Sequence, residues 1–129
     1  MYQVASQFVC PEETAELFDL PVPQREHAFF LCWTRKEAYI KAVADGLYIP
    51  LNSFRVTLNP NDAATFVHLG HNTNAARAWR LEDLRLEAGY AAALASEGAP
   101  RLISVHPTLD PARLLRLFWR NACVDGEFR

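Results

Sequence analysis

The segment from Trp33 to Leu58 constrains the fold of this 129-residue chain more than any other. It begins inside a stretch over 24–44 that contains no proline or glycine, and the apolar residues there recur at helical spacing. Asp45-Gly46 follows, and glycine is the usual residue where a helix ends in a left-handed conformation. Residues 54–58 then alternate between apolar and polar side chains, which is the period of a half-buried strand. The segment therefore predicts a long helix, a tight turn and a strand.

Three side chains of the predicted helix share one face. Trp33, Glu37 and Lys41 are spaced i, i+4 and i+8, and Lys36 lies at the edge of this stripe. A carboxylate flanked by two ammonium groups can hold a divalent cation, while the lysines meet the anion that the cation carries, usually a phosphate. The alternative is a surface Glu37–Lys41 pair that adds about 0.2–0.5 kcal/mol to the helix. Spacing alone favours the surface pair, because such pairs are common on exposed helices.

Other signals give the order of the remaining elements. Pro11-Glu12-Glu13 favours the start of a short helix, since proline is tolerated in a first turn and carboxylates stabilise a helix N-terminus. Pro21-Val22-Pro23 ends it. Within the long helix, core-like spacings predict a buried face at Phe29, Trp33, Ile40 and Val43. Strands are predicted near 65–69, 78–86 and 102–105, and Pro111 opens a predicted tail helix with a broad apolar face.

The motifs around the helix resemble a known family. Residues 33–42 read W-T-R-K-E-A-Y-I-K-A, and Gly46-Leu47, Ile49-Pro50-Leu51 and Ser53-Phe54 follow. This is similar to the 4′-phosphopantetheinyl transferases of the long, pseudo-dimeric class, whose signature is W-x-x-K-E-A-x-x-K-A, a glycine turn and P-L-x-x-F. Residues 4–9 and 89–95 resemble that family's IA-x-RFF and G-Y-x-x-A-x-A segments. The resemblance spans about residues 4–106.

The resemblance implies an α+β fold in which a long helix packs on a small antiparallel sheet. It makes residues 78–86 and 90–95 antiparallel neighbours, although Leu81–Ala95 is rich in helix-favouring residues. We expect a transferase C-terminal-type domain over 1–106 and a C-terminal helical tail over 107–129.

The resemblance also implies a reaction and a site. The family transfers the 4′-phosphopantetheine group from coenzyme A to a serine of an acyl or peptidyl carrier protein, with Mg²⁺. Glu37 would be the metal ligand and a catalytic residue, Lys41 would be catalytic and contact coenzyme A, and Lys36 would bind a coenzyme A phosphate. Arg25 and Arg35 are interpreted as solvated residues of the helix face, and together with Lys36 they could form a basic rim for the carrier protein.

The chain resembles only the second half of the long-class enzymes. Their G-[VI]-D-x-E segment, which supplies two metal carboxylates, would lie upstream of Met1, and no Asp or Glu precedes Glu12. Two interpretations follow. The chain is a transferase that works as an oligomer or with a separate N-terminal half, or it is a non-catalytic or truncated homologue that at most binds coenzyme A or a carrier protein. Exposed Phe29 and Phe30 would favour a homodimer unless the tail helix covers them.

Composition excludes several classes of protein. A formal net charge of −2 gives no basic surface for nucleic acid, and the longest apolar run, 28–33, is far too short to span a bilayer. The three cysteines are widely spaced and form no C-x-x-C pair, so reduced thiols in the cytoplasm are expected. Half of the residues are hydrophobic, which is enough for one compact domain.

Overall fold

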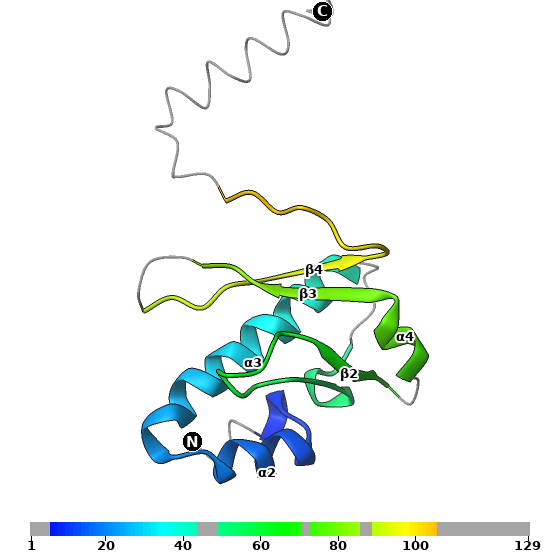
Figure 1. The fold of residues 1–129 in the computed structure, drawn as a ribbon. Helices are drawn as coiled ribbons and strands as arrows, with labels where there is room; N and C mark the ends of the chain where they lie inside the picture. Colours follow the sequence, from blue (N-terminus) through cyan, green and yellow to red (C-terminus); the bar gives the residue numbers. More distant parts are fainter. Residues whose placement is uncertain (1–5, 44–48, 71–72, 86–88, 106–129) are drawn as a thin grey trace, which may run out of the picture.

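The computed structural model describes residues 6–43, 49–70, 73–85 and 89–105. These residues form an α+β fold in which a long helix runs through the molecule, with a short helix at one end and a hairpin at the other (Figure 1). The elements in chain order are α2 (Pro11–Asp19), α3 (Val22–Val43), the 3₁₀ helix η1 (Leu51–Ser53), β1 (Phe54–Val56), β2 (Phe66–Leu69), α4 (Thr73–Arg77), β3 (Trp79–Asp83) and β4 (Ala93–Glu97).

The two predicted helices are confirmed. α2 starts at Pro11, and the backbone N–H of Cys10 donates to the Glu13 carboxylate at 2.8 Å, which caps the helix. Leu20 is extended and ends α2. α3 begins at Val22, two positions before the predicted start, because Pro23 is compatible with the first turn of a helix. The predicted stop at Asp45-Gly46 lies outside the described residues.

The strands form two separate two-stranded antiparallel sheets among the described residues, whereas the sequence predicted one small sheet. β1 pairs with β2 so that Arg55 faces His68, and β3 pairs with β4 so that Leu81 faces Ala95. The predicted antiparallel pairing of 78–86 with 90–95 is therefore confirmed. α3 packs most closely against β4 and also contacts β1 and β3, so the helix joins the two sheets.

The predicted strand at 102–105 is wrong. These residues have no regular secondary structure, and the segment leads away from the body of the fold (Figure 1). Leu102 is 97% exposed, so its apolar side chain does not pack against the described part of the fold. An apolar run favours a strand only where a neighbouring strand can pair with it. The predicted tail helix lies outside the described residues.

The core lies where α2, α3 and the two sheets meet. Tyr39 of α3 joins both sheets, because its ring lies 5.0 Å from Phe54, 5.3 Å from Phe66 and 5.1 Å from Trp79 between centroids, each in an edge-on arrangement. Burial raises the pKa of the Tyr39 hydroxyl. The buried hydrophobic cluster consists of Val9, Leu17, Leu20, Ala28, Cys32, Phe54, Val56, Leu58, Phe66, Leu69, Ala76 and Leu81.

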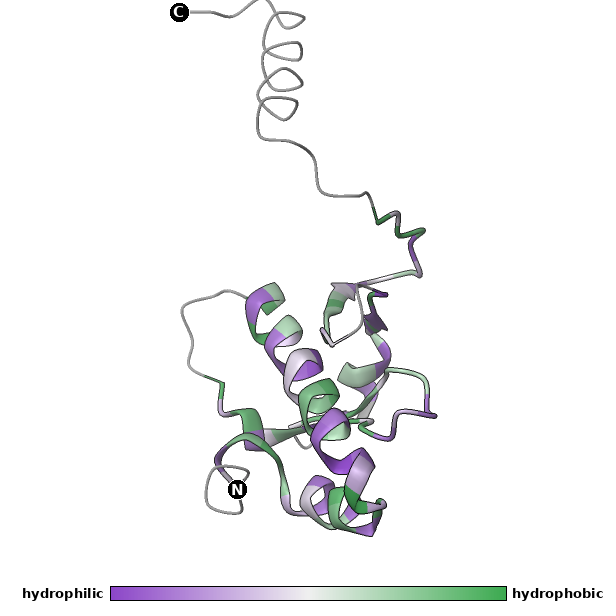
Figure 2. Ribbon diagram, turned by 90° about the vertical axis from the view of Figure 1, so that its left-hand side faces the viewer, coloured by the Kyte–Doolittle hydropathy of each residue, from purple (hydrophilic) through white to green (hydrophobic). Residues whose placement is uncertain are grey.

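The two faces of α3 differ from the predicted ones. Figure 2 shows hydrophobic and hydrophilic residues interleaved around this helix. The buried positions of α3 are 28, 31, 32, 35 and 36, which form one continuous helical stripe that includes Arg35 and Lys36. Phe29 and Ile40, predicted to be core residues, pack against the core and are partly buried. Trp33, predicted to be a core residue, is 38% exposed and rests against Phe8, Phe29 and Phe30. Arg35, predicted to be solvated, is fully buried.

Candidate site on the outward face of helix α3

The predicted stripe of Trp33, Glu37 and Lys41 faces outward. Trp33 and Lys41 are exposed and Glu37 is half-buried. The uninterrupted helix places these side chains one turn apart along the same side of α3. This side of α3 thus carries the half-buried Glu37 and the exposed Lys41, with the Trp33 ring one turn before Glu37.

Lys36, the neighbour of Glu37 in the chain, lies in the core and not on the surface. Its side chain has no exposed surface, and its ammonium group forms an ion pair with Glu13 at 2.6 Å. It also donates to the carbonyl oxygens of Leu51 at 2.6 Å and Phe54 at 2.8 Å. A lysine ammonium has three N–H donors, so these three oxygens use all of them. In the described geometry Lys36 has no donor left for a phosphate.

Glu13 is the partner that makes this burial possible. It is also fully buried, and besides Lys36 it accepts hydrogen bonds from the backbone N–H of Cys10 and of Val56, each at 2.8 Å. One carboxylate thus connects the start of α2, strand β1 and helix α3. Because its oxygens are enclosed and occupied, Glu13 is not available as a metal ligand.

Arg35 forms a second buried contact from α3. Its Nε donates to Asp83 at 2.8 Å and its Nη2 to the other carboxylate oxygen, so the pair is bidentate. Nη1 donates to the backbone carbonyl of Thr57. Arg35 therefore ties α3 to β3 and to the residue after β1. The predicted basic rim of Arg25, Arg35 and Lys36 is wrong, since the last two are buried and Arg25 donates to the carbonyls of Leu20 and Phe18.

Glu37 fits a magnesium site as one ligand. Mg²⁺ takes oxygen ligands and is usually held by one or two carboxylates together with substrate phosphates and water. Within the described part of the chain, no group of three or more His, Cys, Asp and Glu side chains could hold a metal ion. The carboxylate that α3 offers one turn before Lys41 is that of Glu37.

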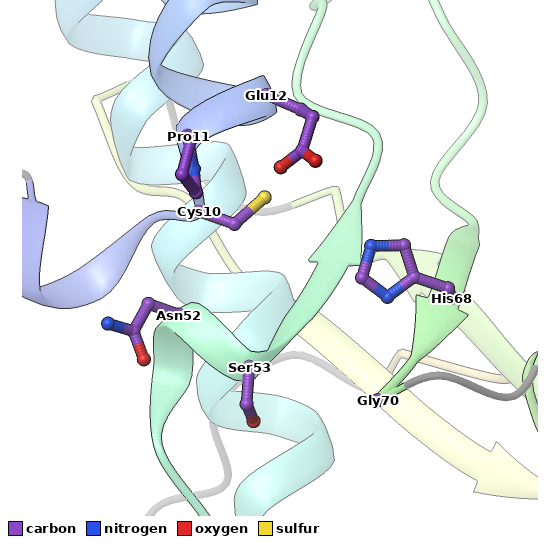
Figure 3. Close-up of a pocket in the computed structure, with 7 residues that line it drawn as sticks. All are labelled: Cys10, Pro11, Glu12, Asn52, Ser53, His68 and Gly70. Carbon is purple, nitrogen blue, oxygen red and sulfur yellow. The ribbon is translucent and has the colours of Figure 1, made fainter.

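Two hollows lie near these elements. One of about 280 Å³ is lined by Phe30, Trp33, Thr34, Tyr90 and neighbouring residues, and it ends one helical turn before Glu37. The other, of about 700 Å³, lies between the start of α2, η1 and the end of β2; its lining residues are Cys10, Pro11, Glu12, Asn52, Ser53, His68 and Gly70 (Figure 3). Neither Glu37 nor Lys41 lines the larger hollow.

The cysteines near the core are not activated nucleophiles. Burial raises the pKa of Cys10 from 9.0 to about 11, and it also raises the pKa of Cys32. A thiol must ionise to react as a nucleophile, so both remain unreactive thiols at neutral pH.

Sequence reasoning missed the partners that bury the two cations. Glu13 stands at the third position of α2, where a carboxylate often caps the helix, and this signal pointed to Cys10 but not to Lys36. Asp83 carries no local signal, because it is 48 positions from Arg35. Positions 28, 31, 32, 35 and 36 have the spacing of one helical face. This spacing would have indicated the buried stripe if Arg35 and Lys36 had not been taken as surface residues because of their charge.

The candidate site thus consists of an outward carboxylate and lysine on a long helix that joins two small antiparallel sheets. The chain as a whole is similar in sequence to known proteins. The family model described as the 4′-phosphopantetheinyl transferase superfamily matches residues 1–95. The 4′-phosphopantetheinyl transferase HetI of Nostoc sp. (strain PCC 7120 / SAG 25.82 / UTEX 2576) is 35% identical over 95 residues. Two further relatives are the 4′-phosphopantetheinyl transferases gsp of Aneurinibacillus migulanus, 36% identical over 64 residues, and psf-1 of Bacillus pumilus, 34% identical over 62 residues.

The chain belongs to the 4′-phosphopantetheinyl transferase superfamily. The three matches cover 74%, 50% and 48% of this chain, and 37%, 27% and 27% of HetI, gsp and psf-1. The shared stretch is thus well under half of each relative. Among the described residues, no helix is long and apolar enough to cross a membrane.

Proposed function

We propose that this chain takes part in transfer of the 4′-phosphopantetheine group from coenzyme A to a serine of an acyl or peptidyl carrier protein. The observation that carries the proposal is the outward placement of Glu37 and Lys41, in a chain that belongs to this superfamily. Because the shared stretch covers 37% of HetI, we propose that transfer needs a second copy or a separate N-terminal half.

The proposed reaction is a displacement at phosphorus. The serine oxygen forms a bond to the β-phosphorus of coenzyme A, the bond from that phosphorus to the leaving oxygen breaks, and 3′,5′-ADP departs. Glu37 accepts the serine proton, directly or through a water molecule. The ammonium group of Lys41 holds a phosphate oxygen as a point charge. Lys36 would have to give up its buried contacts to do the same.

Glu37 would also hold Mg²⁺, together with phosphate oxygens and carboxylates from another polypeptide. When bound, Mg²⁺ neutralises charge on the phosphate oxygens as the P–O bond breaks. The proposal places the chain in the cytoplasm, where the free thiols Cys10 and Cys32 stay reduced.

A second candidate function is binding without catalysis. Among the described residues, no group of three or more His, Cys, Asp and Glu side chains could hold a metal ion, and this favours the second candidate, since isolated carboxylates hold Mg²⁺ weakly. In this case the chain would bind coenzyme A or a carrier protein but transfer nothing.

One experiment separates the two candidates. The purified chain is incubated with coenzyme A, Mg²⁺ and an apo carrier protein, and mass spectrometry of the carrier reports the added group. Calorimetry reports binding of coenzyme A and, separately, of the apo carrier protein. Transfer that Glu37→Gln abolishes supports the transferase, and binding without transfer supports the binding homologue. Glu26→Gln is the matched control, because Glu26 is an exposed glutamate of the same helix about 16 Å from Glu37 along the axis. If the chain showed no binding and no transfer, both candidates would be refuted.

A further inference from the structure

Arg35, Lys36 and Glu37 are consecutive in α3, and only the third reaches solvent. Successive residues of a helix are about 100° apart around its axis, so fixing two neighbouring side chains also fixes the direction of the third. We propose that Lys36 and Arg35 are positioning residues that set the direction of Glu37, with Glu13 and Asp83 as their anchors, and that Lys36 does not contact coenzyme A. The part of this proposal that concerns coenzyme A rests on the proposed function.

The first anchor joins α3 to the start of α2 and to η1. The Lys36 ammonium is held by the Glu13 carboxylate and by the carbonyl oxygens of Leu51 and Phe54, all within 2.8 Å. These acceptors come from two chain segments that precede and follow α3. A rotation of the helix that brought Lys36 to the surface would break all three contacts at once.

The second anchor joins α3 to the sheets. The Arg35 guanidinium meets both carboxylate oxygens of Asp83 in β3 and the carbonyl of Thr57 beyond β1. A guanidinium presents its donors in a fixed plane, so a bidentate contact fixes orientation as well as distance. The two anchors pull adjacent residues toward different elements, which holds both the rotation and the axial position of α3 beside Glu37.

A phosphate contact by Lys36 has a high cost in this geometry. Lys36 would leave Glu13 as an unpaired charge with no exposed surface, and an uncompensated buried charge is strongly unfavourable. Lys41 is exposed and has no such cost. The two lysines of the motif therefore have different roles, one inside the fold and one facing the ligand.

The chain offers a direct test, because Lys36 and Lys41 are its only lysines. The native chain is treated with acetyl N-hydroxysuccinimide, and acetylation at each lysine is read by peptide mass spectrometry. Lys41 should be acetylated and protected by coenzyme A with Mg²⁺, whereas Lys36 should react only after unfolding in urea. Acetylation of native Lys36 at the rate of Lys41, or its protection by coenzyme A, would overturn the proposal.

A double-mutant cycle tests whether the anchor acts through Glu37. Glu13→Gln, Lys36→Met and Glu37→Gln are compared singly and in pairs by calorimetric coenzyme A affinity in Mg²⁺, after circular dichroism shows each variant folded. Glu13→Gln should weaken binding about three- to tenfold, although Glu13 has no exposed surface. In the Glu37→Gln background, Glu13→Gln and Lys36→Met should have no further effect. If the loss of coenzyme A affinity in Glu13→Gln added to that in Glu37→Gln, Glu13 would have a merely structural role. If the loss in Lys36→Met added to that in Glu37→Gln, Lys36 would contact coenzyme A directly.

The readouts also separate this proposal from the proposed function. If the wild-type chain does not bind coenzyme A, the proposed function fails, and the positioning role is judged from the acetylation pattern and from amide hydrogen exchange over residues 35–41. Exchange there should rise in Glu13→Gln but not in Glu16→Gln. Glu16 is the control because it lies on the same helix and pairs only with the part-exposed Arg55 at 3.2 Å. Equal exchange in the two variants would refute the positioning role.

Discussion

The two partners of the Arg35–Asp83 ion pair differ in burial, and this difference predicts unequal effects of removing them. The Arg35 side chain is 1% exposed, whereas that of Asp83 is 37% exposed. Asp83→Ala leaves a guanidinium inside the fold whose remaining hydrogen-bond acceptors among the described residues are the carbonyl and the hydroxyl of Thr57. Arg35→Met removes the buried charge and leaves Asp83 at a position that water can reach.

The structure gives the order of magnitude of each effect. Loss of one partner of a buried ion pair usually costs about 3–5 kcal/mol, so we expect Asp83→Ala to lower the free energy of unfolding by that amount. Arg35→Met should cost about 1–3 kcal/mol, mainly from the unpaired Thr57 carbonyl and lost packing, because Asp83 is hydrated and its pairing is partly screened. The double variant should be close to Arg35→Met alone.

Urea unfolding followed by circular dichroism measures these differences. Asp62→Ala, at an exposed aspartate in a loop, is the control and should change the free energy of unfolding by less than about 0.5 kcal/mol. If Arg35→Met proved more destabilising than Asp83→Ala, or if the two losses added up in the double variant, the assignment of Arg35 as the buried partner would be refuted.

Three further predictions follow from other parts of the structure. Tyr39→Leu should lower the free energy of unfolding by about 2–4 kcal/mol and Tyr39→Phe by much less, because the Tyr39 ring joins the two sheets. Equal losses for the two variants in urea unfolding would show that the ring is unimportant. Burial raises the pKa of Cys10 from 9.0 to about 11, so the folded chain holds this proton to a higher pH than the unfolded chain does. The free energy of unfolding should therefore fall as the pH rises from about 9 to about 11, and it should fall less steeply in Cys10→Ala. Phe30 and Trp33 are 41% and 38% exposed, so we expect a homodimer by light scattering that Phe30→Ser/Trp33→Ser dissociates; a wild-type monomer would contradict this.

Local signals in the sequence were sufficient for α2 and α3 but did not predict α4, whose first residues were expected to form a turn. Proline and the carboxylates that follow it marked the start of α2, and the stretch without proline or glycine marked α3. The pairing of β3 with β4 needed more than local signals, because intrinsic preference favours helix over 81–95. Ala93 and Ala95 lie half-buried in β4, the strand that α3 packs against most closely, and small side chains permit that close approach.

Burial of charged residues could not be predicted from local signals. A cation can occupy the core only where a partner lies within hydrogen-bond distance, and the fold supplies these partners from distant positions. Asp83 reaches Arg35 across 48 residues, and Lys36 meets the Phe54 carbonyl across 18. Arg35 was predicted to be solvated and Trp33 to be buried because of their residue types. In the structure, burial depends instead on the position in the helical stripe and on whether a hydrogen-bond partner is available.

The outward stripe and the buried anchors have a common consequence for function. A catalytic or binding group is most effective when the fold holds it in place before the ligand arrives, and groups on anchored helices are held better than groups on loops. In our positioning proposal, Glu37 follows directly after two residues whose charges are paired inside the fold, so a rotation of α3 that redirected Glu37 would break both ion pairs. The conformational entropy of the anchored residues is therefore lost during folding and not during ligand binding. The same anchors would serve a transferase and a homologue that only binds, so it is the carboxylates beside Glu37 in the assembled protein that decide between the two.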